Sequence, residues 1–142
     1  MFREYKTNAV VCQGNLSRGE DLLKGLTAVL NKKNITCGCI TGIGAVTQAR
    51  IAYFNHAQKR YEELFLQQGM EILSLTGNIS QKDGVIFPHI HVVLSGSDFK
   101  AIGGHLLDET LVYAFEYEIL QFEGTPFVRK FDDDTGLFLW KE

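Results

Sequence analysis

Apolar and polar positions along this chain mostly form short runs that are separated by glycine and polar turns. The exception lies near the N-terminus, where a stripe of apolar residues recurs at helical spacing, namely Leu22, Leu26, Val29 and Leu30. Ser17 and Glu20 have the spacing of a capping box before this stripe, and Asn34 is a suitable stop after it. The pattern therefore predicts one main helix over about residues 18–33.

The other apolar runs predict strands. They are Ala9–Cys12, Cys37–Ile43, Val46–Phe54, Tyr61–Leu66, Met70–Ile79, Val85–Ser95, Phe99–Ile102, Leu111–Phe122, Phe127–Phe131 and Leu137–Trp140. Glycines at positions 42 and 44 divide two of these runs and predict a sharp bend. Many short strands with one helix indicate an α+β fold with a mostly antiparallel, strongly bent sheet. A length of 142 residues suits a single domain, 1–142.

Composition narrows the function classes. Hydrophobic residues make up 45% of the chain, which is enough for a core without disulfides. The net charge is −3, whereas a protein that binds nucleic acid through phosphates usually carries a basic excess. We see no apolar stretch of the roughly 20 residues that span a bilayer and no signal-peptide core. With three cysteines in no disulfide framework, we expect a cytoplasmic protein without membrane contact.

Three of the four histidines fall between positions 89 and 105. His89 and His91 lie two apart in a predicted strand, so both are expected on one face. If the following loop has three residues, 96–98, His105 lies opposite His89, and His91 lies opposite Gly103. Opposed side chains have Cβ atoms roughly 4.5–5.5 Å apart, so three imidazoles would converge. A two-residue loop would instead turn His105 to the other face.

Three imidazoles suit Zn²⁺ or a similar divalent ion and leave one coordination position for water, an anion or a substrate. The alternative is that the histidines are separate polar residues bonded to backbone groups. Glu116 and Glu118 share a strand face, and either could accept a hydrogen bond from a metal-bound imidazole. For both carboxylates the alternative is a solvent-facing charge. We see no motif for an organic cofactor.

At these residues the sequence resembles the plants-and-prokaryotes-conserved (PPC) domain in its stand-alone prokaryotic form. The matching segments run in order over nearly the whole chain, and together they are specific. They are Arg18 to Leu22, Gly42 to Val46, Glu71 to Ile79, His89 to Val92 and Gly103 to Leu106. The resemblance implies an α+β fold that assembles as a homotrimer. It also implies that the histidines of the last two segments, His89, His91 and His105, form a metal site.

In plants the same domain follows AT-hooks, which are short Arg-Gly-Arg elements that enter the minor groove. This chain has no Arg-Gly-Arg, and we see no extension to carry one. A homotrimer would bury part of its aromatic strand faces, such as Tyr113, Phe115 and Tyr117. The leading hypothesis is thus a trimeric metal-binding module that binds a small ligand or a protein partner and acts in regulation.

Two alternatives stay open. The first is a DNA-binding, transcription-associated protein, for which the charge gives no support. The second is a metal-dependent hydrolase of a small substrate, since a zinc-bound water can attack at neutral pH. Glu71, Glu116 and Glu118 are the candidates for its general base, and the sequence assigns no catalytic residue.

Overall fold

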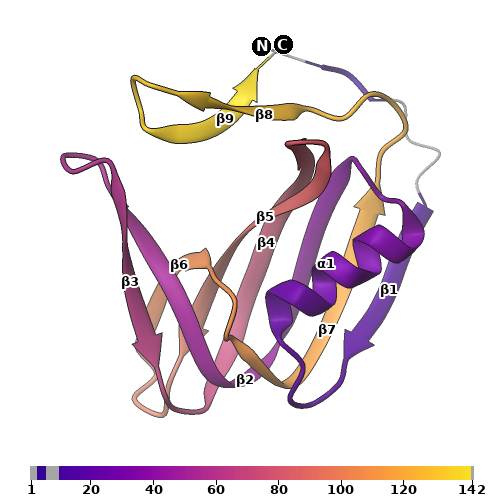
Figure 1. Ribbon diagram of the computed structural model, residues 1–142. Coiled ribbons are helices and arrows are strands. Elements are labelled where there is room, and N and C mark those ends of the chain that lie inside the picture. The colour runs from indigo at the N-terminus through magenta and orange to yellow at the C-terminus, as the bar shows by residue number, and fades with distance from the viewer. Residues whose placement is uncertain (1–2, 6–9, 142) are drawn as a thin grey trace.

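The computed structural model describes residues 3–5 and 10–141, and it confirms the predicted α+β fold (Figure 1). One helix and nine strands form its described part. In chain order they are β1 Val10–Leu16, α1 Leu22–Lys33, β2 Gly38–Asn55, β3 Arg60–Leu66, β4 Met70–Lys82, β5 Val85–Ser95, β6 Ala101–Leu106, β7 Leu111–Gln121, β8 Val128–Asp132 and β9 Leu137–Lys141. Ala9, which the sequence places in the first strand, lies outside the described residues.

Helix α1 begins at Leu22, later than the capping-box pattern predicted. The Glu20 carboxylate does accept a hydrogen bond from the Ser17 amide, but both residues belong to a turn that precedes the helix. Asp21 is the N-cap instead, and its side chain accepts a hydrogen bond from an amide in the first turn. Asn34 ends the helix in a left-handed conformation, as its position predicted. The buried stripe is Leu22, Leu26 and Leu30.

β2 organises the sheet because it has different neighbours along its two halves. Its first half pairs with β4 on one side and β7 on the other, and its second half pairs with β3 and β6. β4, β5 and β6 pair in turn, so these four strands form a closed circuit of antiparallel pairings. Helix α1 lies across β1 and β7, and its apolar stripe joins the core on the inner face (Figure 1).

The sequence divided β2 into two strands, but the structure has one continuous strand with a bulge. Its register against β4 shifts between Gly42 and Gly44. A side chain at Gly44 would overlap the carbonyl oxygen of Ala114 on β7, so glycine permits the close approach of the two backbones. The predicted bend is therefore present, and it occurs inside the strand instead of interrupting it.

The inner face of β7 also differs from the expected alternation. Phe115 and Tyr117 are buried at 1% and 9% exposure, but Tyr113 is 53% exposed. Register shifts between β2 and β7 near Val46 place Val112 in the core in place of Tyr113. Phe115 and Tyr117 are thus already buried in the core of this chain. This corrects the expectation that contacts between the subunits of a trimer would bury them.

The β8–β9 hairpin lies across one end of the sheet (Figure 1). β8 pairs in parallel with the last residues of β4, and β9 pairs with β8. The turn of the hairpin contacts the β2–β3 turn, where Lys59 Nζ donates to the Asp133 carbonyl oxygen at 2.8 Å. The hairpin consequently lies over the ends of β4 and β5, next to the histidines.

Candidate metal centre

β5 presents two histidines on the face opposite to the core. His91 is exposed and His89 is half-buried. The residues that alternate with them, Ile90, Val92 and Leu94, are all buried in the core. The predicted alternation is therefore present, because the apolar residues of this strand occupy the inner face and leave the imidazoles outside.

The β5–β6 hairpin brings His105 opposite His91, and not opposite His89 as predicted. The connection holds five residues instead of three, because Phe99 and Lys100 stay in the loop instead of starting the strand. Phe99 has a left-handed backbone conformation with φ 61°, and its side chain is 91% exposed. A difference of two residues preserves the side-chain alternation, so His105 still shares the face of the other two.

The three imidazoles form a compact cluster. Their ring centroids are separated by 5.0 Å for His89 and His91, 4.9 Å for His89 and His105, and 5.5 Å for His91 and His105. One ring nitrogen from each residue can be chosen so that all three lie within 4.8 Å of one another. Two adjacent strands thus supply three nitrogen donors around one point on the outer face.

The surroundings favour the neutral, metal-binding form of two of these imidazoles. Burial lowers the pKa of His89 to about 4, with further lowering by the charge of Arg129 and by the other histidines. Burial and the charge of His91 lower the pKa of His105 to about 4. His105 Nδ1 is buried and has no hydrogen-bond partner among the described residues. An unpartnered ring nitrogen beside two other imidazoles fits a metal ligand.

Arg129 of β8 lies beside the cluster, and only 7% of it is exposed. Its Nε donates to Ser80 Oγ at 2.9 Å, Nη1 donates to the Phe138 carbonyl oxygen at 3.0 Å, and Nη2 donates to Asn78 Oδ1 at 2.8 Å. Nη2 also lies 3.3 Å from His89 Nδ1. No sequence pattern predicts this contact, since β8 is separated from β5 by more than thirty residues.

Tyr61 of β3 lies beside His105. Its ring centroid is 5.2 Å from that of His105. Burial raises the pKa of Tyr61, and the nearby charge of Arg129 opposes that rise. Tyr61 and Arg129 are the two neighbours that the sequence did not associate with the histidines.

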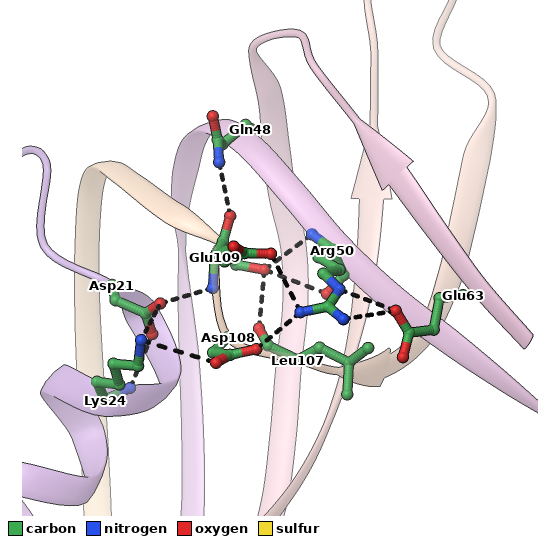
Figure 2. Close-up of polar contacts among 9 residues, drawn as sticks. Asp21, Lys24, Gln48, Arg50, Glu63, Leu107, Asp108 and Glu109 are labelled. Atoms are coloured by element: carbon green, nitrogen blue, oxygen red, sulfur yellow. Dashed lines mark hydrogen bonds and ion pairs between the residues drawn. The ribbon is translucent and has the colours of Figure 1, made fainter. Parts of the chain in front are cut away.

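The loop that follows His105 is held by Arg50 of β2 (Figure 2). Arg50 Nη2 lies 2.6 Å from Oε2 of Glu63 on β3. Its Nη1 contacts the carboxylates of Asp108 at 3.0 Å and Glu109 at 3.1 Å. These groups are partly exposed, so each pair contributes little to stability. Together they fix the end of β6 against β2 and β3, and with it the position of His105.

Glu116, the candidate hydrogen-bond acceptor for a metal-bound histidine, lies elsewhere. It is on β7 opposite Ile43, and β2 and β4 separate β7 from β5. Three strand spacings amount to roughly 14 Å, too far for a hydrogen bond to an imidazole. Glu116 and Glu118 instead line an open groove of about 930 Å³ on the same outer face. The groove extends to Thr76, which is the direct neighbour of His91 across β4 and β5.

The fold and the cluster define a class of protein with one helix, a bent antiparallel sheet and three convergent imidazoles on its outer face. The chain belongs to the Plants and Prokaryotes Conserved (PCC) domain family, whose model matches residues 3–123. The family resemblance of the sequence is thereby confirmed. No helix among the described residues has the length and apolar character that crossing a bilayer requires.

Several solved structures resemble this one. A metal-containing protein from Archaeoglobus fulgidus is 39% identical with a TM-score of 0.92, covering 99% of this chain and 100% of that one. A PPC protein from Pyrococcus horikoshii is 31% identical with a TM-score of 0.92, covering 100% and 97%. A candidate DNA-binding protein from Bacteroides thetaiotaomicron is 28% identical with a TM-score of 0.86, covering 97% and 96%. Among curated proteins, none matches this chain.

Proposed function

We propose that this protein is a homotrimeric metal-binding module in which His89, His91 and His105 hold one divalent ion, with zinc as the physiological metal. The proposal rests on the convergence of three imidazole nitrogens within 4.8 Å of one another. The ion would take its remaining ligand from a small molecule or a protein partner, which is the event the module senses. The Archaeoglobus relative is described as metal-containing, which supports this function.

Zinc suits this donor set because neutral imidazoles are among its preferred ligands and three protein ligands leave a position open. Burial keeps His89 and His105 unprotonated at neutral pH, so the ion need not displace protons from them. When bound, zinc supplies a Lewis acid that polarises a ligand oxygen. The groove that extends to Thr76 offers space on the same face for a ligand larger than water.

Elemental analysis of tag-free protein tests the metal site. We expect about one zinc per chain in the wild type and its loss in His89→Ala, His91→Ala and His105→Ala. His56→Ala is the matched control, because His56 is the fourth histidine and lies in the β2–β3 turn beside Tyr53 and Phe54. Wild-type protein that stays metal-free after incubation with zinc would refute the proposal, as would variants that retain the ion.

A trimer needs a contact surface between its subunits, and an apolar surface that is exposed in the single chain is a candidate for it. Ile43 and Leu73 are 60% and 53% exposed, and both line a shallow depression on the outer face of β2 and β4. We propose that this region contributes to the contact between subunits. Sedimentation should then give a trimer for the wild type and for Phe99→Asp, whose site is on the β5–β6 loop, but smaller species for Ile43→Asp. A wild-type monomer at micromolar concentration would contradict the proposal.

DNA binding is the second candidate function, and the Bacteroides relative favours it. It must overcome a net charge of −3, because phosphate contacts need basic side chains. Its test is binding to an A·T-rich duplex at two salt concentrations. Affinity that falls steeply with salt would support it, and no binding at low salt would exclude it.

A metal-dependent hydrolase would need a base close to the ion. Glu71, Glu116 and Glu118 are on β4 and β7, and none of the contacts of the histidines among described residues involves a carboxylate. The neighbours there are Arg129 and Tyr61, and neither supplies a carboxylate base. Hydrolysis of a small ester that a chelator abolishes, and that His91→Ala lacks, would overturn our preference for binding over hydrolysis.

A further inference from the structure

Arg129 is a buried cation without a carboxylate partner in the described part of the chain. Its hydrogen bonds go to a hydroxyl, an amide oxygen and a backbone carbonyl, on Ser80, Asn78 and Phe138. Its ring neighbours, Phe87 and Trp140, are also uncharged. Arginine remains protonated in proteins, so the positive charge persists in this site.

A buried charge is costly unless it meets an opposite charge or a full set of hydrogen bonds. Four contacts occupy four of the five N–H groups of Arg129, and one of these four is the long contact to His89 Nδ1. Any divalent ion held by the three histidines would add two more positive charges next to it. No contact of Arg129 among the described residues offsets this positive charge with a carboxylate.

The contact with His89 indicates where such an offset would lie. A guanidinium donates hydrogen bonds and cannot accept them, so Nδ1 must present a lone pair to Arg129. The same lone pair is a metal donor. If the ion binds at Nδ1, the N–H of Arg129 is released from the ring and remains beside the ion. That N–H then needs a new acceptor, and an oxygen of an anion bound to the metal can fill this role.

We propose that the metal centre binds a small oxyanion, which is shared between the ion and the guanidinium of Arg129. The inference rests on the proposed metal site and names the chemical class of its ligand. Carboxylates and phosphates both have the two oxygens that such sharing requires, and both form charge-assisted hydrogen bonds with arginine. Tyr61, whose ring lies beside that of His105, can supply a further donor through its hydroxyl.

Cobalt provides a direct readout, because its absorption spectrum changes when a ligand enters its coordination sphere. Tag-free protein loaded with Co²⁺ is titrated with sodium acetate and, in a second series, with sodium phosphate, both at constant ionic strength. A saturable change with one anion and not the other identifies a carboxylate or a phosphate as the preferred class. A spectrum that responds to neither anion overturns the inference.

Variants of the β8–β9 hairpin test whether Arg129 binds the anion. Arg129→Gln should weaken anion binding by about tenfold or more, and Arg129→Lys, which keeps the charge, should weaken it less. Lys130→Gln removes a charge from the same strand and should leave the affinity within about twofold. Equal affinity of wild type and Arg129→Gln would overturn the inference.

Two further results keep the test decisive. Loss of cobalt binding in the wild type would defeat the metal site itself, whereas bound cobalt that ignores anions defeats only the oxyanion. If Arg129→Gln does not fold, wild-type protein labelled with ¹⁵N-arginine still decides. Its Nε–H resonance nearest to Co²⁺, identified by paramagnetic broadening, must shift in the zinc form when the preferred anion is added, and an unchanged resonance overturns the inference.

Discussion

Mild acid should destabilise the metal-free protein through His89 and His105. Both imidazoles have a folded-state pKa of about 4, below the ordinary value of 6.5, because burial disfavours their charged form. Between these two values the unfolded chain binds more protons than the folded one. The free energy of unfolding therefore rises with pH across this window and falls as the solution is acidified from about pH 6.5 to about pH 4.

The size of the effect follows from the two shifts. One pKa unit corresponds to about 1.4 kcal/mol, so a fall from 6.5 to about 4 corresponds to at most about 3.4 kcal/mol for one imidazole. Neither ring is fully buried, and solvent screens part of the penalty. The two rings also respond to a shared neighbour, His91, so their contributions do not simply add. We expect about 2–4 kcal/mol for the pair.

Urea unfolding in the presence of a chelator measures this, with far-UV circular dichroism at several pH values between about 4.5 and 7.5. The double variant His89→Gln/His105→Gln removes both titrating groups and should flatten the profile. Asp132 does not interfere, because its hydrogen bonds with Lys141 and Thr135 lower its pKa to about 2, and its contribution is lost only at lower pH. A flat wild-type profile, or an unchanged slope in the double variant, would refute the reasoning.

Substitutions of Asp21 and Gly44 test the fold, with Ser17→Ala as the control for the first. Asp21→Ala should lower the free energy of unfolding by about 2 kcal/mol, because its carboxylate caps α1 and accepts an amide of the β6–β7 loop, whereas Ser17→Ala should cost less than about 0.5 kcal/mol. Gly44→Ala should cost more than about 2 kcal/mol, because the new methyl group would overlap the Ala114 carbonyl oxygen. Urea denaturation measures all three variants, and equal effects of Asp21→Ala and Ser17→Ala would contradict the assigned cap.

Local patterns predicted most of the elements and the buried faces of α1 and β5. The leucine stripe of α1 and the alternation of β5 each follow from one buried face, which period alone reveals. The predicted register of the β5–β6 hairpin was wrong by two residues. Phe99 is exposed in the loop, but phenylalanine is a residue type that is common in strands, so the predicted strand began there. The face of His105 was nevertheless correct, since strand alternation depends only on whether the shift is even or odd.

Contacts between segments that are distant in the chain could not be predicted from the sequence. Tyr61 and Arg129 reach the histidines from β3 and β8, and their positions depend on how β2 bends and how the last hairpin lies over the sheet. Neither residue carries a motif. Glu116 was wrongly expected near the histidines. Strand alternation predicts which face of the sheet it lies on, but not how many strands separate it from His89 and His91.

The histidines and their neighbour Arg129 come from different parts of the chain, and this affects how the function should be tested. The three histidines lie within residues 3–123, the part that the family model matches, whereas Arg129 lies beyond it. A metal held by the family's portion can thus meet a charge supplied by another part of the chain. Under the function proposed above, the ion's open position and this charge would together select the ligand, so two relatives with the same histidines could bind different molecules. The ligand is therefore best identified on this chain itself, with the guanidinium of Arg129 in place.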